Sequence, residues 1–222
     1  RQKYATLGEL GAVGRFNRFT AQYPFVSVIP AAASEEYLAL SRDSGPSVFR
    51  GKLFPADAFA LLWSGGFNTW TDPAGLAAAL SLAMEEESAI QLVVTGGAIR
   101  GHDEQTFAEF QQKMEQAGFA NRCHYLGWIE GRDLLALHRE CDLGLCFDSL
   151  LYESVFGART RLTNMMAAGL PVLTTVCTEI TEVIEEAGLG YTVPVGDIHG
   201  YANAIVRACR HPDERHSLAR KA

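Results

Sequence analysis

The sequence predicts a doubly wound α/β fold, in which helices cover both faces of a parallel sheet. From residue 58 onward, short and almost wholly apolar runs alternate with segments of helical periodicity. Strands that are apolar on both sides are typical of a parallel sheet buried between two helical layers. Two of the runs end at adjacent glycines, Gly65-Gly66 and Gly96-Gly97, as expected where a strand turns towards a helix.

The expected strands are short runs of Leu, Val, Ile and aromatic residues, which suit a buried, pleated surface. They cover residues 58–64, 90–95, 123–128, 142–147, 172–175 and 190–195. The expected helices repeat apolar side chains three or four residues apart. They cover residues 73–87, a stretch from 107 up to 118, and residues 131–138, 160–168, 180–187 and 199–209. Asp72 is expected to cap the first helix before Pro73, and Gly118 and Gly188 to end two others.

The first 50 residues do not follow this alternation. Residues 1–13 have a helical pattern, 25–29 read as a strand, and 41–54 are rich in Arg, Gly, Ser and Pro, as in a surface connection. We assign residues 1–50 to a linker and the end of a preceding N-terminal domain, and residues 51–222 to one α/β domain. Because the chain opens at Arg1 rather than Met, we expect it to be a fragment of a longer protein.

Composition excludes several classes of protein. The 222 residues are 48% hydrophobic, which suffices for a substantial core. The formal net charge of −7 argues against a nucleic-acid partner. The five cysteines are odd in number and contain no Cys-x-x-Cys pair, so we expect buried, reduced thiols in a cytoplasmic protein. The sequence also lacks a Gly-x-Gly-x-x-Gly fingerprint, a secretory signal, and the Asp-x-Asp pair of metal-dependent transferases.

The first candidate site segment is residues 63–72, between the first strand and first helix of the alternating region. Gly65 and Gly66 would let backbone N–H groups approach a phosphate, and the helix N-terminus that follows favours negative charge. The alternative is a tight turn in which Asp72 serves only as the helix cap. Trp63 is expected in the core, whereas Trp70 lies in the loop and stays a candidate for ligand binding.

The second candidate segment is residues 153–171. It places Glu153 in the loop after a strand, and then Arg159, Thr160 and Arg161 at the start of a helix. Arginine at a helix N-terminus opposes the helix dipole, so we expect an anion nearby. A guanidinium group suits a diphosphate, and Thr160 is a further donor. The alternative is a surface ion pair with Glu153 or Asp148.

Together the two segments resemble the retaining GT-B glycosyltransferases of the group 1 type. Residues 153–175 are similar to the family signature, in which two glutamates separated by seven residues precede a small-residue helix, Gly-x-Pro-Val and a strand. Residues 63–72 resemble the Trp-x-Gly-Gly…Trp-x-Asp-Pro loop of a bacterial subgroup whose helix begins Arg-Thr-Arg. The resemblance covers nearly the whole chain. It implies one Rossmann-like lobe of a two-domain protein, with the active site in the cleft between the lobes.

The resemblance also implies roles for individual residues. Glu153 corresponds to the glutamate that touches the donor sugar, and Asn164 takes the place of the glutamate that holds the ribose. Gly65 and Gly66 match the phosphate loop. The nucleotide base is expected against Gly127, Trp128 and Ile129.

The sequence departs from the family pattern in three ways. Asn164 replaces a carboxylate, and ten residues rather than seven separate it from Glu153. The loop also lacks the family's usual Arg and Lys, with Gly66 in the position of the Arg. We expect Arg159 and Arg161 to supply the missing positive charge to the leaving diphosphate. The alternative is a site that has decayed and binds poorly.

The sequence therefore predicts the donor-binding domain of a glycosyltransferase that uses a nucleoside-diphosphate sugar. The resemblance implies retention at the anomeric carbon, and we expect no metal and no cofactor beyond the donor. Glu153 and Arg161 are the expected catalytic residues; the acceptor is a glycan, a lipid or a small molecule, and attachment to the inner membrane stays open. We expect the chain to bind nucleotide but to need its N-terminal domain for turnover. The alternatives are a nucleotide-sugar epimerase of the same architecture and a non-catalytic binding or scaffold module.

Overall fold

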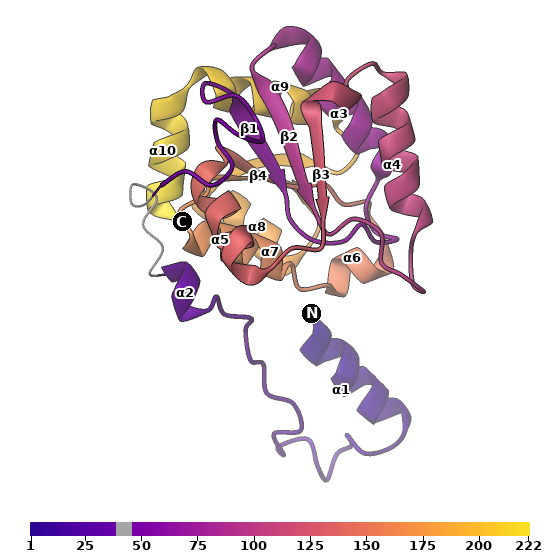
Figure 1. Cartoon of the computed structure of the whole chain (residues 1–222). Helices are drawn as coiled ribbons and strands as arrows, with labels where there is room; N and C mark the ends of the chain where they lie inside the picture. Colours follow the sequence, from indigo (N-terminus) through magenta and orange to yellow (C-terminus); the bar gives the residue numbers. More distant parts are fainter. Residues whose placement is uncertain (39–45) are drawn as a thin grey trace.

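A computed structural model describes residues 1–38 and 46–222, and it confirms the doubly wound fold (Figure 1). Within the described residues, six parallel strands form one sheet in the order β3-β2-β1-β4-β5-β6. The strands are β1 (Phe59–Trp63), β2 (Ile90–Thr95), β3 (Cys123–Gly127), β4 (Leu143–Cys146), β5 (Val172–Val176) and β6 (Tyr191–Pro194). Each lies within two residues of its predicted bounds.

Helices cover both faces of the sheet. They are α3 (Pro73–Glu86), α4 (Gln105–Gln116), α5 (Gly131–Glu140), α6 (Tyr152–Phe156), α7 (Thr160–Ala167), α8 (Glu179–Ala187), α9 (Ile198–Arg210) and α10 (Pro212–Lys221), with a 3-10 turn at Ala120–Arg122. α3, α4 and α9 pack on one face, and α5, α7 and α8 on the other. The sequence pattern did not predict the short α6 or the C-terminal α10.

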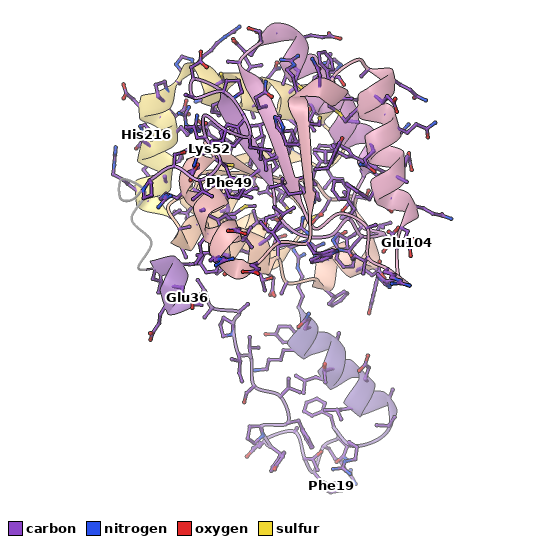
Figure 2. The ribbon with its side chains drawn as sticks, in the orientation of Figure 1. Phe19, Glu36, Phe49, Lys52, Glu104 and His216 are labelled. Carbon is purple, nitrogen blue, oxygen red and sulfur yellow. The ribbon has the colours of Figure 1, made fainter. Side chains whose placement is uncertain are left out.

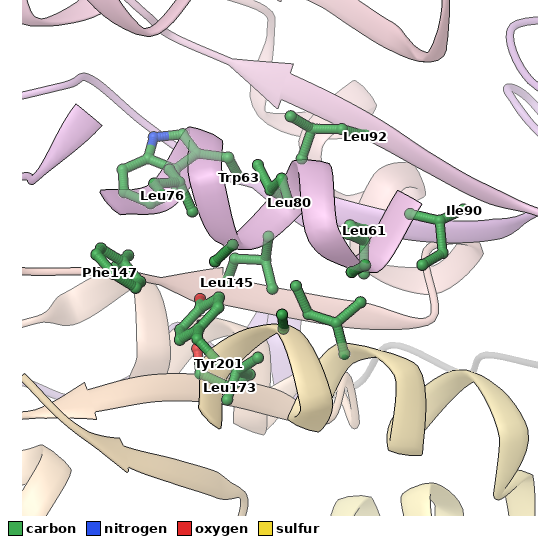
Figure 3. Close-up of a cluster of buried hydrophobic side chains, with 14 of the residues drawn as sticks. Leu61, Trp63, Leu76, Leu80, Ile90, Leu92, Leu145, Phe147, Leu173 and Tyr201 are labelled. Atoms are coloured by element: carbon green, nitrogen blue, oxygen red, sulfur yellow. The ribbon is translucent and has the colours of Figure 1, made fainter. Parts of the chain in front are cut away.

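Alternate side chains of β1 divide between two cores. Leu61 and Trp63 point into the core shared with α3 and α9, which Figure 3 shows, whereas Ala60 and Leu62 point into the other. All five residues of β1 are buried, as a central parallel strand requires. The near-continuous apolar run that predicted this strand therefore reflects burial on both of its faces.

Local capping chemistry follows the sequence prediction. Asp72 caps α3 and accepts a hydrogen bond of 2.8 Å from the N–H of Gly75. Gly188 ends α8 with a left-handed φ of 60°, and Gly118 follows α4 with a φ of 81°. All five cysteines lie within the described residues and none of them forms a disulfide; four are buried and Cys209 is half-buried. No helix in the described ranges is both long and apolar enough to span a bilayer.

The N-terminal segment, residues 1–38, lies apart from the sheet. Its helices are α1 (Gln2–Ala12) and α2 (Glu35–Leu38), and Phe19 projects from the segment at its far end (Figure 2). The strand predicted at residues 25–29 is wrong: no described strand pairs with this stretch, so its backbone has no ladder to join. Arg1 attaches α1 to the domain through hydrogen bonds to Glu179 and to the carbonyl of Cys177.

The surface connection predicted at residues 41–54 is correct for the exposed residues among 46–53 and wrong for Phe54. Residues 41–45 lie outside the described residues. Beyond them, Phe54 is buried in the second core. Residues 47–50 are hydrogen-bonded to the carboxylate of Glu140, at the end of α5. A distant carboxylate, rather than any local pattern, anchors this part of the chain.

Candidate functional site

The candidate site lies where the strand order reverses. β1 has β2 on one side and β4 on the other, so the loops that follow β1 and β4 leave the sheet next to each other. Ligands of doubly wound folds bind at such a switch point, outside the carboxyl ends of the strands. The two segments singled out from the sequence begin here: residues 63–72 follow β1, and residues 153–171 follow β4. At the same edge α6 meets the start of α1, where Gln2 donates to the carbonyl of Phe156 (Figure 1).

The glycines after β1 pack directly on those after β2. Gly65 has a φ of 105°, and Gly66 forms a parallel bridge with Gly97. Gly96, with a φ of 76°, donates a hydrogen bond of 2.6 Å to the carbonyl of Gly127, which connects the β3 loop to the same layer. A Cβ atom on Gly66 would lie 2.7 Å from the side chain of Ile99. These glycines are thus needed for packing, whether or not a phosphate binds there.

Gly96→Ala is expected to lower the free energy of unfolding by about 2 kcal/mol more than Gly118→Ala does. Both positions have positive φ, so both substitutions carry the same backbone strain of about 1–2 kcal/mol. A new Cβ at position 96 would lie 2.6 Å from the carbonyl oxygen of Gly65, whereas position 118 has no atom within 4 Å. Urea unfolding of the two variants measures the difference. Equal losses would show that the glycine layer tolerates a side chain.

Arg161 brings the two segments together. It lies in the first turn of α7, and its Nη2 atom donates a hydrogen bond of 3.0 Å to the carbonyl of Gly66. Its guanidinium carbon lies 4.8 Å from the ring centre of the buried Trp63. The side chain is half-buried, so part of the cation stays accessible beside the glycine loop. A positive charge therefore stands at a loop that has no basic residue of its own.

Arg159 lies in the interior rather than beside Arg161. Its side chain is 5% exposed, and its Nε atom lies 2.5 Å from Oδ2 of Asp148, which is 3% exposed. Its guanidinium carbon is 5.0 Å from the ring centre of Trp70. The expectation that both arginines face a diphosphate therefore does not describe this structure. The alternative partner, Asp148, is present, but the ion pair is buried and not on the surface.

Glu153 and Trp70 also connect the two segments, and Glu153 lies in α6 rather than in the predicted loop. Thr69 donates a hydrogen bond of 3.0 Å to the exposed carboxylate of Glu153. The carbonyl of Trp70 accepts one of 2.7 Å from the N–H of Ser149, just after β4. Thr69 could not be predicted, because no sequence motif marks it. Asp148 was predicted only as a surface partner, although its place directly after an apolar strand indicates a position at the site.

The remaining predicted residues lie around this centre. Thr160 is exposed at the first position of α7, and Asn164 is half-buried one turn further along. Gly127, Trp128 and Ile129 lie at the end of β3, across β2 from the glycine loop. Trp128 is 67% exposed, and its indole N–H donates a hydrogen bond of 3.1 Å to the carbonyl of Ala98. The exposed indole ring of Trp128 offers a flat face on which an aromatic ring could stack.

The thiols nearest to Asp148 are protonated at neutral pH. Burial raises the pKa of Cys177 to about 11 and also raises that of Cys146. Since the thiolate is the reactive form of cysteine, neither residue is suited to nucleophilic chemistry here. Among the predicted site residues, the charges of Arg161 and Glu153 are at least partly accessible, whereas Arg159 is buried.

Comparison with known proteins identifies the family. The model of the glycosyl transferases group 1 family matches residues 48–222. The chain belongs to this family. A phosphatidyl-myo-inositol mannosyltransferase of Mycobacterium leprae (strain TN) is 29% identical over 133 residues, which are 60% of this chain and 32% of that protein.

Two solved structures share the fold of the chain. Anabaena Alr3699/HepE, solved in complex with UDP and glucose, superposes with a TM-score of 0.71 at 20% identity, covering 84% of this chain and 48% of that one. WaaG, a glycosyltransferase involved in lipopolysaccharide biosynthesis, superposes with a TM-score of 0.67 at 18% identity, covering 91% and 53%. This chain thus has the fold of a Rossmann-like GT-B lobe. It spans about half or less of the length of each of these three relatives. The division predicted at residue 50 stays a prediction.

Proposed function

We propose that this chain is the donor-binding domain of a glycosyltransferase that moves a sugar from a nucleoside diphosphate to an acceptor, with retention and without a metal. Membership of the group 1 family supports a transferase. The UDP-bound relative supports a nucleotide sugar as donor. The acceptor class is a glycan, a lipid or a small molecule, and the mannosyltransferase relative, which its name associates with a phosphatidylinositol, favours a lipid.

The observation that carries this proposal is the position of Arg161 against the Gly65–Gly66 loop. Negative charge develops on a diphosphate as the sugar leaves, and a cation already in place at the loop stabilises it without moving. The first backbone N–H groups of α7, at Thr160 and Arg161, add donors at the positive end of the helix dipole. In the family pattern the positive charge comes from the loop after β1 itself. In this chain Arg161 of α7 would supply it.

The other predicted roles fit the same placement. Glu153 would contact the donor sugar from α6, with Thr69 holding its carboxylate. The base would lie against Gly127–Ile129, and Asn164 would offer its amide to the ribose.

A second domain of the same protein is the proposed partner of the N-terminal segment. Large apolar side chains stand exposed along it: Tyr4, Val13, Phe19, Tyr23, Val28 and Ile29. An acceptor-binding domain packed on this segment would cover them and would close the cleft over the donor. The same proposal places this protein in the cytoplasm, where it would meet a lipid-linked acceptor at the inner membrane.

Arg161→Ala is expected to weaken nucleotide binding about 10–100-fold, since a hydrogen bond to a charged group contributes about 1.5–3 kcal/mol. Titration calorimetry with UDP, GDP, ADP and dTDP, with and without EDTA, identifies the base. One nucleotide is expected to bind, with the same affinity in EDTA.

Arg207→Ala is the matched control, because it removes an arginine from a surface ion pair between α9 and α10. It should bind nucleotide like the wild type. Equal affinity in Arg161→Ala, or no binding of any of the four nucleotides, would contradict the donor-site proposal.

A further inference from the structure

Three segments of the chain meet at Asp148. Its backbone forms an antiparallel bridge with Thr71, in the loop after β1. Its N–H donates a hydrogen bond of 2.9 Å to the hydroxyl of Thr175 on β5. Its side chain binds Arg159, the residue that immediately precedes α7. The β1 loop, β5 and the start of α7 are thus attached to one residue at the end of β4.

Arg159 stands at the N-cap of α7, but its side chain makes no capping hydrogen bond. It turns inward instead, between Asp148 and the ring of Trp70. Gly157 leaves the space that this requires, because a Cβ atom there would collide with the guanidinium group. The buried contact between Arg159 and Asp148 therefore fixes the first turn of α7, which contains Arg161, beside the end of β4.

This arrangement is poorly explained by stability alone. Both side chains are at least 95% buried, and among the described residues none accepts a hydrogen bond from Nη2 of Arg159. A buried donor without a partner has a cost, and buried ion pairs replaced by apolar side chains often leave a protein equally stable. What the pair does supply is a defined position for the start of α7.

Arg161 depends on that position. It lies two residues beyond Arg159, donates a hydrogen bond to the Gly66 carbonyl and lies over the ring of Trp63. Both contacts come from β1 and its loop, and Asp148 ties that loop to α7 through Thr71 on one side and Arg159 on the other. A shift of α7 relative to the β1 loop would separate the guanidinium group from the glycines.

We propose that the buried Asp148–Arg159 pair is a positioning pair, which holds Arg161 against the Gly65–Gly66 loop and thereby sets the affinity for the diphosphate. The inference rests on the proposed function for its ligand, but the positioning itself is a property of the free protein. Neither residue of the pair needs to touch the donor.

The test replaces the pair by apolar residues in the double variant Asp148→Leu/Arg159→Met, which keeps the net charge. Its control is Arg207→Met/Glu214→Leu, which removes an ion pair of α9 and α10 away from the site. The indole N–H signals of the three tryptophans are followed by NMR in the absence of nucleotide. Trp70 reports on Arg159, Trp63 reports on Arg161, and Trp128 is an internal reference.

In the apolar-pair variant the signals of Trp70, Trp63 and the Gly66 amide are expected to shift, while that of Trp128 stays in place. The control variant should leave all four unchanged. Unshifted Trp63 and Gly66 signals would overturn the positioning role, whatever the protein binds. If these signals shift but wild-type protein binds no nucleotide, the proposed function fails while the positioning role stands.

Binding supplies a second readout that a merely structural role would not change. The apolar-pair variant is expected to bind the preferred nucleoside diphosphate about tenfold more weakly than the wild type, and the matching nucleoside equally well. Adding Arg161→Ala to it should bring the total loss of affinity no further than that of Arg161→Ala alone, about 10–100-fold, because coupled residues are not additive. Full additivity of the two changes would overturn the inference.

Discussion

Arg159→Met is expected to lower the free energy of unfolding by about 3–5 kcal/mol, a large part of the stability of a domain of this size. The substitution leaves the carboxylate of Asp148 3% exposed and without its cationic partner. A buried charge that loses its partner keeps its full desolvation cost. Urea unfolding followed by circular dichroism measures the loss.

Two comparisons show whether the loss comes from the unpaired charge. Arg207→Met breaks an ion pair whose arginine is 62% exposed, and should cost no more than about 1 kcal/mol. The apolar-pair variant, which removes Asp148 as well, should recover most of the stability that Arg159→Met loses. If Arg159→Met matches Arg207→Met, the buried pair does not have the energetic role described here.

Glu140→Gln is expected to cost about 3 kcal/mol at neutral pH. Burial by itself would raise the pKa of this carboxyl group. Four hydrogen bonds oppose that effect and lower its pKa to about 2; the donors are the backbone N–H groups of Arg50, Val48 and Phe49 and the Ser47 hydroxyl. A carboxyl group whose pKa is lower in the folded state stabilises the fold above its unfolded pKa of about 4.3. That contribution disappears as the pH falls from there through about 2.

The pH dependence follows directly from this sign. The stability gap between wild type and Glu140→Gln should be widest at pH 7 and should narrow when urea unfolding is repeated at pH 3. Glu109→Gln, which changes a half-exposed carboxylate paired with Lys113 on α4, controls for the general effect of acid. A gap that is the same at both pH values would show that Glu140 does not anchor residues 47–50 through its charge.

Most elements of the domain could be predicted because their signals are local. The apolar run at 90–95 is strand β2 to the residue, and Asp72 caps α3 as its position before Pro73 indicates. The stretch 25–29 has the same strand-like composition but forms no strand, since a strand needs a neighbouring strand to complete its hydrogen bonds. Likewise, Phe54 looked like part of a surface connection, and only the packing of β1 and α5 shows that it is buried.

The candidate site shows the same division. The glycine pair and the arginine pair identified both loops, because those residue types in those places suit an anion. The sequence could not separate Arg159 from Arg161, which stand two residues apart at one helix start. The two side chains differ because Asp148, eleven residues before Arg159 and just after β4, binds Arg159 in the interior. Arg161 instead meets Gly66, ninety-five residues away in the sequence.

The sequence by itself determined the parallel α/β alternation, the caps and the two loops of the candidate site, since periodicity and capping act over a few residues. Only the tertiary structure decided which arginine is buried with Asp148 and which reaches the Gly66 carbonyl, and that Glu140 anchors residues 47–50. The physical reason is that the energy of a charged side chain depends on its desolvation and on partners brought from distant parts of the chain.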